Sequence, residues 1–134
     1  MTANDQDIAD LSLEQVENHN WGDPPSDATR LIATVHRLRR KPIKNLTAAD
    51  LRTLIAQRVG LLVLVPRVLP HLERDPYLEA DYYPGDLLVA VLRVPASHWQ
   101  THPQQRARVE QITAHVTDPD DQLKADIDKF HTGQ

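Results

Sequence analysis

Proline sets the strongest limit on what this chain can fold into. Ten prolines and four glycines interrupt the 134 residues, and a proline inside a helix removes a backbone hydrogen bond and crowds the preceding turn. Between these breaks, apolar residues recur every three or four positions, which is the helical period. The pattern predicts an all-α fold, a compact single-domain bundle of about six to seven short helices. We expect residues 1–10 to form a flexible N-terminal tail and residues 11–134 to form a single helical domain.

Capping residues predict where several helices begin. Ser12 with Gln15, and Thr47 with Asp50, have the spacing of capping boxes, in which two side chains satisfy free backbone N–H groups of the first turn. Serine and aspartate are also good single caps. These signals predict helices over residues 13–18, from Ser26 to Arg39, from Thr47 to about Arg58, and from Asp118 towards the C-terminus.

The segment Leu61–Glu73 could form either a helix or a buried strand. It opens with LLVLV, a run of five apolar residues that would also suit a buried strand. We favour a helix because its apolar residues keep helical spacing and because one strand alone cannot make a sheet. Pro66 and Pro70 should bend this helix or confine it to a short piece. Helical spacing predicts the inward-facing residues Leu62, Val65, Leu69 and Leu72 here, and Leu31, Ile32, Val35 and Leu38 in the helix that ends at Arg39.

Composition narrows the setting of the protein. No cysteine is present, so disulfides and thiolate metal sites are excluded and a reducing cytosol fits. The longest apolar run, LLVAVL at residues 87–92, has six residues, whereas a membrane-spanning helix needs roughly 18. The N-terminus is acidic and polar, unlike a secretory signal. We therefore expect a cytoplasmic protein that does not enter a membrane.

Charge is unevenly distributed along the chain. The net charge of −4 argues against general affinity for nucleic acid. Residues 36–44 nevertheless carry five Lys or Arg and no acid, whereas residues 73–86 and residues 118–128 each carry five acids and one base. Distinct basic and acidic faces suit the selective recognition of a partner.

No motif assembles the residues that catalysis needs. The sequence lacks a nucleophile elbow, a phosphate-binding loop, a dinucleotide fingerprint and a zinc-protease motif, so we expect neither an enzyme nor a cofactor. His98 and His102 have the i, i+4 spacing of metal ligands, but Pro103 interrupts a helix through both. We interpret them as surface histidines beside a buried Trp99 and expect no metal site. Trp99 and Trp21 are expected to be packing anchors.

The segment DPYLEADYYPGD is the best candidate for contact with a partner. It holds all three tyrosines of the chain, surrounded by acids. Tyrosine offers a large rigid apolar body with a polar tip, which suits interfaces as well as cores. An alternative is a small nucleic-acid-binding regulator that uses the basic helix end at residues 36–44. The candidate partner-binding residues are Asp75, Glu79, Asp81, Tyr82, Tyr83 and Asp86.

Five stretches in a fixed order make a recognisable pattern. They are NWGDP at residues 20–24, then LIATVHRLRRKPI, LTAADLRTLIAQRVGL, LVPRVLPHLERDP and DYYPGDLLVAVLRV. Their order and spacing over residues 18–94 are more specific than any one of them. On these motifs the chain resembles the immunity proteins of bacterial contact-dependent growth inhibition (CDI) systems. Residues 95–134 carry no motif of this resemblance.

The resemblance implies that residues 11–134 form an immunity-type domain that binds and neutralises the C-terminal toxin domain of a CDI effector. It implies a nuclease toxin, met in the cytoplasm, whose active site or substrate cleft is blocked. An acidic surface would complement the basic cleft of such a toxin. The family assigns no catalytic residue. We expect the free protein to be a monomer, and the unmatched C-terminal tail stays open as an alternative contact surface.

Overall fold

The computed structural model describes residues 8–133, and its regular structure is helical. The predicted all-α fold is confirmed. Over the described residues there are eight α-helices instead of six or seven, because the segment between Pro95 and Pro103 forms a helix of its own. The elements are α2 (Leu13–Glu17), α3 (Arg30–Arg39), the 3-10 helix η1 (Ile43–Asn45), α4 (Ala48–Ala56), α5 (Leu61–Arg74), α6 (Asp86–Leu92), α7 (Ala96–Thr101), α8 (Pro103–Ala114) and α9 (Asp121–Thr132).

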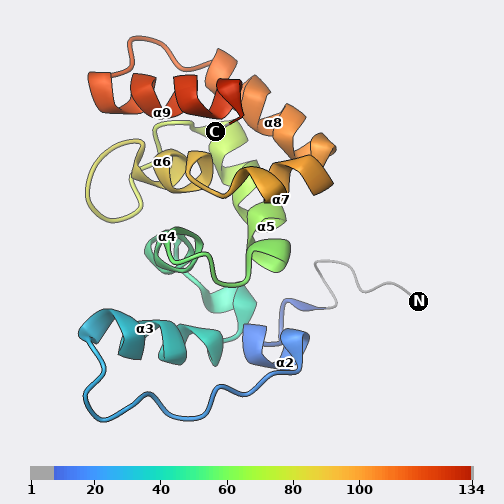
Figure 1. Cartoon of the computed structure of the whole chain (residues 1–134), viewed down its shortest axis with the longest axis vertical. Coiled ribbons are helices and arrows are strands. Elements are labelled where there is room, and N and C mark those ends of the chain that lie inside the picture. The colour runs from blue at the N-terminus through green and yellow to red at the C-terminus, as the bar shows by residue number, and fades with distance from the viewer. Residues whose placement is uncertain (1–7, 134) are drawn as a thin grey trace.

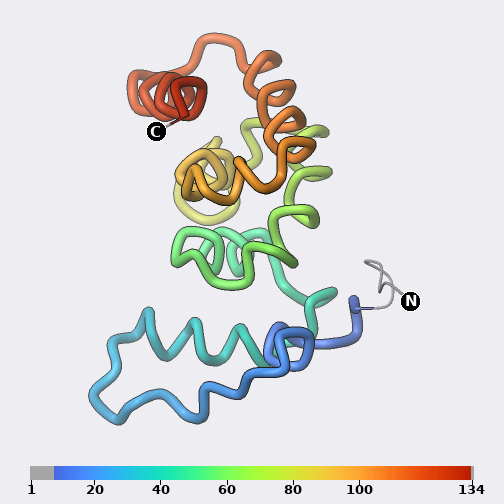
Figure 2. Tube along the Cα trace, turned by 45° about the vertical axis from the view of Figure 1, so that its right-hand side comes forward, coloured from blue at the N-terminus to red at the C-terminus, as the bar shows by residue number. Residues whose placement is uncertain are grey.

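The helices are arranged as a stack. From bottom to top in Figure 1, α3, α4, α6 and α9 lie one above another, and each packs on the next. α5 runs along one side of this stack and packs against α4, α6 and α8. Figure 2 shows the same order from a second direction, with the N-terminal helices at one end and α9 at the other. α6 lies in the middle, so all of its residues are buried.

α5 is a continuous helix of 14 residues although it contains two prolines. The prediction of a helix instead of a strand is confirmed, and Pro66 and Pro70 do not confine it to a short piece. Each proline leaves a carbonyl one turn earlier without its usual N–H partner. Leu62, Pro66 and Pro70 recur every four residues along one side of the helix, away from the fully buried Val65 and Val68. On that side a freed carbonyl can be hydrated, which makes the prolines tolerable.

Both predicted capping boxes are present, at the starts of α2 and α4. The other two predicted caps are wrong by a few residues. Thr29, not Ser26, caps α3, with its hydroxyl accepting the N–H of Ile32 at 3.1 Å; the residues before it form a turn because the loop from α2 folds back along α3. Asp120, not Asp118, caps α9. Asp118 has a left-handed φ of 57°, whereas an N-cap is extended.

Three side chains that were predicted to face inward are exposed. Leu31 and Ile32, in the first turn of α3, are each 44% exposed. The reason is that α3 ends the stack and has a neighbouring layer on one side only (Figure 1). Leu62 is 71% exposed because the first turn of α5 lies at the end of that helix away from α8. The other inward-facing residues predicted for these two helices are buried.

The predicted N-terminal tail is only partly within the described residues. Its first seven residues lie outside them. The residues that follow are held along η1, since the Lys44 N–H donates to the carbonyl of Ala9 at 2.9 Å and the Ile43 N–H donates to that of Leu11 at 2.8 Å.

Candidate functional site

The candidate segment forms the loop between α5 and α6, here called the tyrosine loop (residues 75–85). It projects from the side of the stack, at the left of Figure 1. Its ends are joined, because the Gly85 N–H donates to the carbonyl of Tyr77 at 3.0 Å and Glu79 pairs with Pro84 in an isolated β-bridge. The φ of Gly85 is 90°, a conformation that suits glycine and turns the chain into α6. The tyrosine loop is therefore closed on itself at its base.

Asp86, the first residue of α6, holds this loop in place. Its carboxylate accepts three backbone N–H groups, those of Ala80 at 2.7 Å, Asp81 at 2.9 Å and Tyr82 at 2.8 Å. Burial raises the pKa of Asp86, but the three N–H donors and the nearby Arg52 outweigh burial, so this pKa lies below its ordinary value. Asp86 is only 1% exposed. Asp86 is thus the candidate partner-binding residue whose side chain is buried and bonded within the protein, where a partner cannot contact it.

The three tyrosines divide between the core and the surface. Tyr77 packs against the core, and its hydroxyl donates to the carbonyl of Thr117 at 2.5 Å. Tyr82 is 69% exposed and Tyr83 is 39% exposed. The guanidinium of Arg52 lies over the ring of Tyr82, with its central carbon 4.6 Å from the ring centroid. This cation–π contact gives the most exposed tyrosine a defined neighbour.

The acids of residues 73–86 also divide. Asp75, Glu79 and Asp81 are exposed on the tyrosine loop. Asp75 additionally accepts the backbone N–H two residues further on, at 3.0 Å. Glu73 accepts two hydrogen bonds from Arg108 of α8, at 2.6 and 3.0 Å, and this partner lowers the pKa of Glu73. The charge available to a partner is therefore that of the loop acids.

The fold brings the second acidic segment next to the tyrosine loop. The hydrogen bond from Tyr77 to Thr117 fixes the loop between α8 and α9 beside it, and Leu123 of α9 lies beside Gly85. In Figure 1 the tyrosine loop and the start of α9 lie on the same side of the stack. The exposed acids of both segments, here called the acidic surface, are Asp75, Glu79, Asp81, Asp118, Asp120 and Asp121.

The basic segment, in contrast, is paired with acids of the same chain. Arg39 is 2% exposed, and its guanidinium donates to the Glu17 carboxylate and the His19 carbonyl, whereas its buried Nε has no hydrogen-bond partner among the described residues. Arg37 is the exception among the five bases, with no ion-pair partner among the described residues. Little positive charge is therefore free at residues 36–44. The ion pairs are Arg39 with Glu17 at 2.8 Å, Arg40 with Asp23 at 3.2 Å, Lys41 with Asp50 at 2.7 Å and Lys44 with Asp10 at 2.5 Å.

The two tryptophans differ in their surroundings. Trp99 is 2% exposed and its indole N–H donates to the carbonyl of Val94 at 3.2 Å, so its predicted role as a packing anchor is confirmed. Trp21 is 41% exposed. The guanidinium of Arg39 lies 4.1 Å from the Trp21 ring centroid, and His36 makes an edge contact with the ring. Trp21 is thus packed on one side and open on the other.

The histidine pair is a structural feature of the junction between α7 and α8. His98 is 7% exposed, so its interpretation as a surface histidine is wrong; its Nε2 lies 2.8 Å from the Gln105 side-chain oxygen, and its ring stacks on that of His102. Burial lowers the pKa of His98. α7 ends before His102, as the sequence predicted. Within residues 8–133, no three His, Asp or Glu side chains are grouped as metal ligands.

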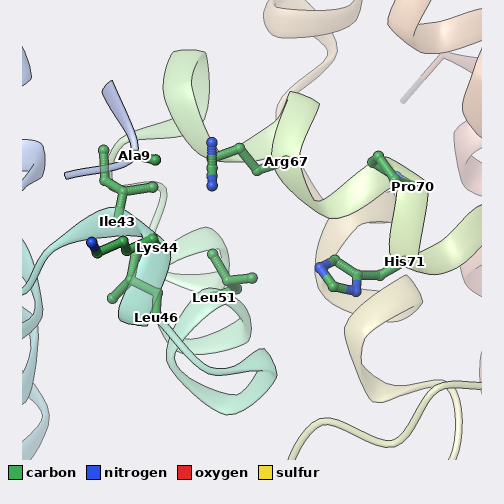
Figure 3. A pocket seen from close by; sticks show the side chains of 8 residues that line it. All are labelled: Ala9, Ile43, Lys44, Leu46, Leu51, Arg67, Pro70 and His71. Atoms are coloured by element: carbon green, nitrogen blue, oxygen red, sulfur yellow. The ribbon is translucent and has the colours of Figure 1, made fainter. Parts of the chain in front are cut away.

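A cavity of about 410 Å³ lies between η1, α4 and α5 (Figure 3). Arg67 and His71 extend from α5 on one side of the cavity, and Ile43 and Leu51 face them from the other. The residues that line this cavity include bases but no carboxyl, hydroxyl or thiol side chain.

Fold and surface describe a small helical protein with a projecting acidic and aromatic loop. The family model of the CDI immunity proteins matches residues 15–109, more than half of the chain. The chain belongs to the family of CDI immunity proteins. It is thus an immunity protein against a CDI toxin, and the family implies a cognate toxin protein as its partner. A comparison with curated proteins finds no match.

The matched segment includes the tyrosine loop and ends within α8, before the acids at the start of α9. No helix of the described residues has the length and apolar character needed to cross a membrane. Sequence reasoning missed the arginines beside the tyrosine loop. Arg93 lies far along the chain from Arg52 and Arg58, and the three form no motif, so no local signal could have grouped them.

Proposed function

We propose that this immunity protein binds the C-terminal toxin domain of a CDI effector in the cytoplasm and covers its active site or substrate cleft. In this proposal the toxin is a nuclease, the free immunity protein is a monomer, and the immunity protein catalyses no reaction. The observation that carries the proposal is the acidic surface beside the exposed Tyr82 and Tyr83. A nuclease holds a polyanion in a basic cleft, and an acidic surface competes for the same electrostatic site.

The anchoring of the tyrosine loop supports this proposal. Ordering a loop on binding costs free energy, so a loop that is fixed beforehand binds more tightly. Here the carboxylate of Asp86 bonds three successive backbone N–H groups of the loop. Tyr82, placed on this fixed loop, has the chemistry of an interface hot spot.

The position of the family match supports it as well. The acidic surface combines acids from inside the matched segment with Asp118, Asp120 and Asp121 from outside it. A shared scaffold with a variable edge is what an immunity protein needs if each one recognises its own toxin.

The alternative of a nucleic-acid-binding regulator loses its support. It rested on five bases at residues 36–44, and four of these are ion-paired within the chain. A base that already neutralises a neighbouring carboxylate releases few counterions from a phosphate backbone.

The test uses the toxin domain encoded immediately upstream, produced with and without this protein. We expect the two to co-purify, the host to be protected, and the toxin's nuclease activity to be inhibited. Replacing Tyr82 by Ala should weaken the affinity about 30-fold, the effect of losing a hot spot of roughly 2 kcal/mol. Asp81→Lys should slow association, and more so at low salt. Calorimetry and stopped-flow kinetics measure the two effects.

Asp27→Lys is the matched control, because Asp27 is exposed in the loop before α3 and lies off the acidic surface. It changes the net charge by the same amount as Asp81→Lys. Equal effects of the two reversals would mean that only net charge matters and that the surface is assigned wrongly. A bound toxin that still cleaves its substrate would contradict the blocking mechanism, and a toxin that cleaves no nucleic acid would contradict the nuclease assignment.

A further inference from the structure

Three arginines meet beside the tyrosine loop. Arg52 of α4, Arg58 just after α4 and Arg93 at the end of α6 line a cavity of about 220 Å³. Tyr83 of the tyrosine loop also lines this cavity, and Asp86 forms part of its wall. The cavity, here called the arginine pocket, is therefore continuous with the surface proposed to face the toxin.

Two of the three guanidinium groups lie near an acid, but only one of them is hydrogen-bonded to it. Arg93 donates to both carboxylate oxygens of Asp126, at 3.0 and 3.1 Å. Arg52 lies 3.6 Å from the nearest oxygen of Asp86, which is too long for a hydrogen bond. The buried Nε of Arg52 has no hydrogen-bond partner within the described part of the chain. Arg52 is therefore paired with Asp86 by charge alone, which is a weaker pairing than the two hydrogen bonds between Arg93 and Asp126.

Arg58 is exposed and has neither an ion pair nor a hydrogen bond to its side chain among residues 8–133, so its charge faces solvent without an acidic partner. Its φ of 60° is left-handed, at the position after the helix cap where glycine is favoured. A side chain other than glycine is disfavoured in that conformation. The left-handed conformation thus disfavours any side chain at this position, whereas the negative end of the α4 dipole and the place beside the pocket both favour a cation.

We propose that the arginine pocket accepts one carboxylate side chain of the toxin domain, which rests on the proposed function above. Guanidinium groups bind carboxylates through paired, charge-assisted hydrogen bonds. Two of the three arginines are paired with Asp86 and Asp126, so the one positive charge left matches a single carboxylate. A polyanion such as nucleic acid would meet the exposed acids of the tyrosine loop next to the pocket and be repelled.

A pocket of opposite sign to its surroundings also explains how one toxin is chosen. A non-cognate toxin with a basic cleft would be attracted to the acidic surface, but it would place a positive group, or no charged group, opposite the arginines. Like charges placed opposite each other in an interface are strongly unfavourable. The toxin-facing surface therefore has both signs, and the pocket fixes the orientation of the bound toxin.

The test compares Arg58→Gly and Arg58→Glu with the wild type in calorimetric titrations of the toxin domain encoded immediately upstream. We expect Arg58→Gly to weaken binding about tenfold or more, and Arg58→Glu to weaken it further. Because glycine suits this backbone, the melting temperature of Arg58→Gly should be unchanged or higher. Arg37→Glu, a reversal of another exposed arginine, is the control and should change affinity only about twofold to threefold. A compensating Asp→Arg or Glu→Arg change in the toxin should restore the affinity of Arg58→Glu.

The outcomes separate the two proposals. A toxin domain that does not bind the wild-type protein overturns both. A toxin domain that binds the wild type and both Arg58 variants equally overturns the arginine pocket alone and leaves the proposed function standing. If the wild-type protein binds a labelled single-stranded RNA tightly and Arg58→Gly abolishes that binding, then the occupant is a polyanion and the carboxylate assignment is wrong.

Discussion

Replacing Asp86 by Asn would probe the anchor of the tyrosine loop with a change of almost no volume. The carboxylate accepts the N–H groups of Ala80, Asp81 and Tyr82 through its two oxygens. An asparagine has only one oxygen. If that oxygen faces Asp81 and Tyr82, the new NH₂ group meets the N–H of Ala80, donor against donor. One hydrogen bond is then lost, and two become bonds to a neutral acceptor.

The expected loss of stability follows from these bonds. A hydrogen bond to a charged acceptor contributes about 2 kcal/mol and one to a neutral acceptor about 1 kcal/mol. Losing one and weakening two gives a loss of about 4 kcal/mol, before any relaxation of the loop reduces it. With a urea slope of about 2 kcal/mol per molar, the unfolding midpoint should fall by roughly 1.5–2 M. Circular dichroism during urea unfolding measures this shift.

The pH dependence gives a second readout of the same group. The pKa of Asp86 lies below its ordinary value, so the ionised carboxylate stabilises the folded chain fully above roughly pH 4. This contribution is lost as the pH falls through the pKa of the folded state. The stability difference between the wild type and Asp86→Asn should therefore shrink on acidification.

Asp81→Asn is the matched control, because the Asp81 side chain is exposed in the same loop. Its stability should stay within about 0.5 kcal/mol of the wild type. The reasoning is refuted if Asp86→Asn is also within that range at neutral pH, or if its difference from the wild type does not change with pH.

Three further predictions concern stability. Gly60→Ala should lower the free energy of unfolding by about 2 kcal/mol or more, because the φ of Gly60 is 69° and a Cβ would lie 2.7 Å from the buried Leu13. Gly22→Ala is the control: Gly22 has a φ of 75° but open space around it, so the loss should be only about 1 kcal/mol. Equal urea midpoints for the two variants would contradict the contact with Leu13. Burial lowers the pKa of His98, so its neutral form is favoured in the fold and stability should rise with pH up to roughly 6.5; His98→Gln should flatten a plot of melting temperature against pH, and an unchanged slope would argue against this. Leu62→Gln, at a 71% exposed position, should change stability by less than about 0.5 kcal/mol, and a loss above roughly 2 kcal/mol would place this side chain in a core.

Local signals explain what could be predicted from the sequence. The two capping boxes are confirmed because their side chains bond backbone groups only three residues away. The segment 61–74 is helical, as its apolar spacing predicted. Leu31 and Leu62 were expected to be buried but are exposed. Their spacing predicted the correct helices, but it could not show how far the neighbouring helices extend along them, and this decides burial at a helix end.

The candidate site was predicted in part. The segment with the tyrosines does project from the fold, and Tyr82 and Tyr83 are exposed. The sequence places Asp86 after the Pro84–Gly85 turn, at the start of a helix where an acid is favoured, but nothing local shows that its carboxylate is buried. Only the folded loop turns three N–H groups towards its carboxylate and removes it from the surface.

The sequence by itself determined the helical class, most helix boundaries, the resemblance to CDI immunity proteins and the segregation of charge into segments, because each depends on residues close together in the chain. The tertiary structure decided which of those charges a partner can reach. Stacking the helices pairs the basic segment with its own acids, joins two acidic segments about forty residues apart, and gathers three arginines beside Tyr83. Electrostatic forces depend on distance in space, and for residues far apart in the chain only the packing of the helices sets that distance.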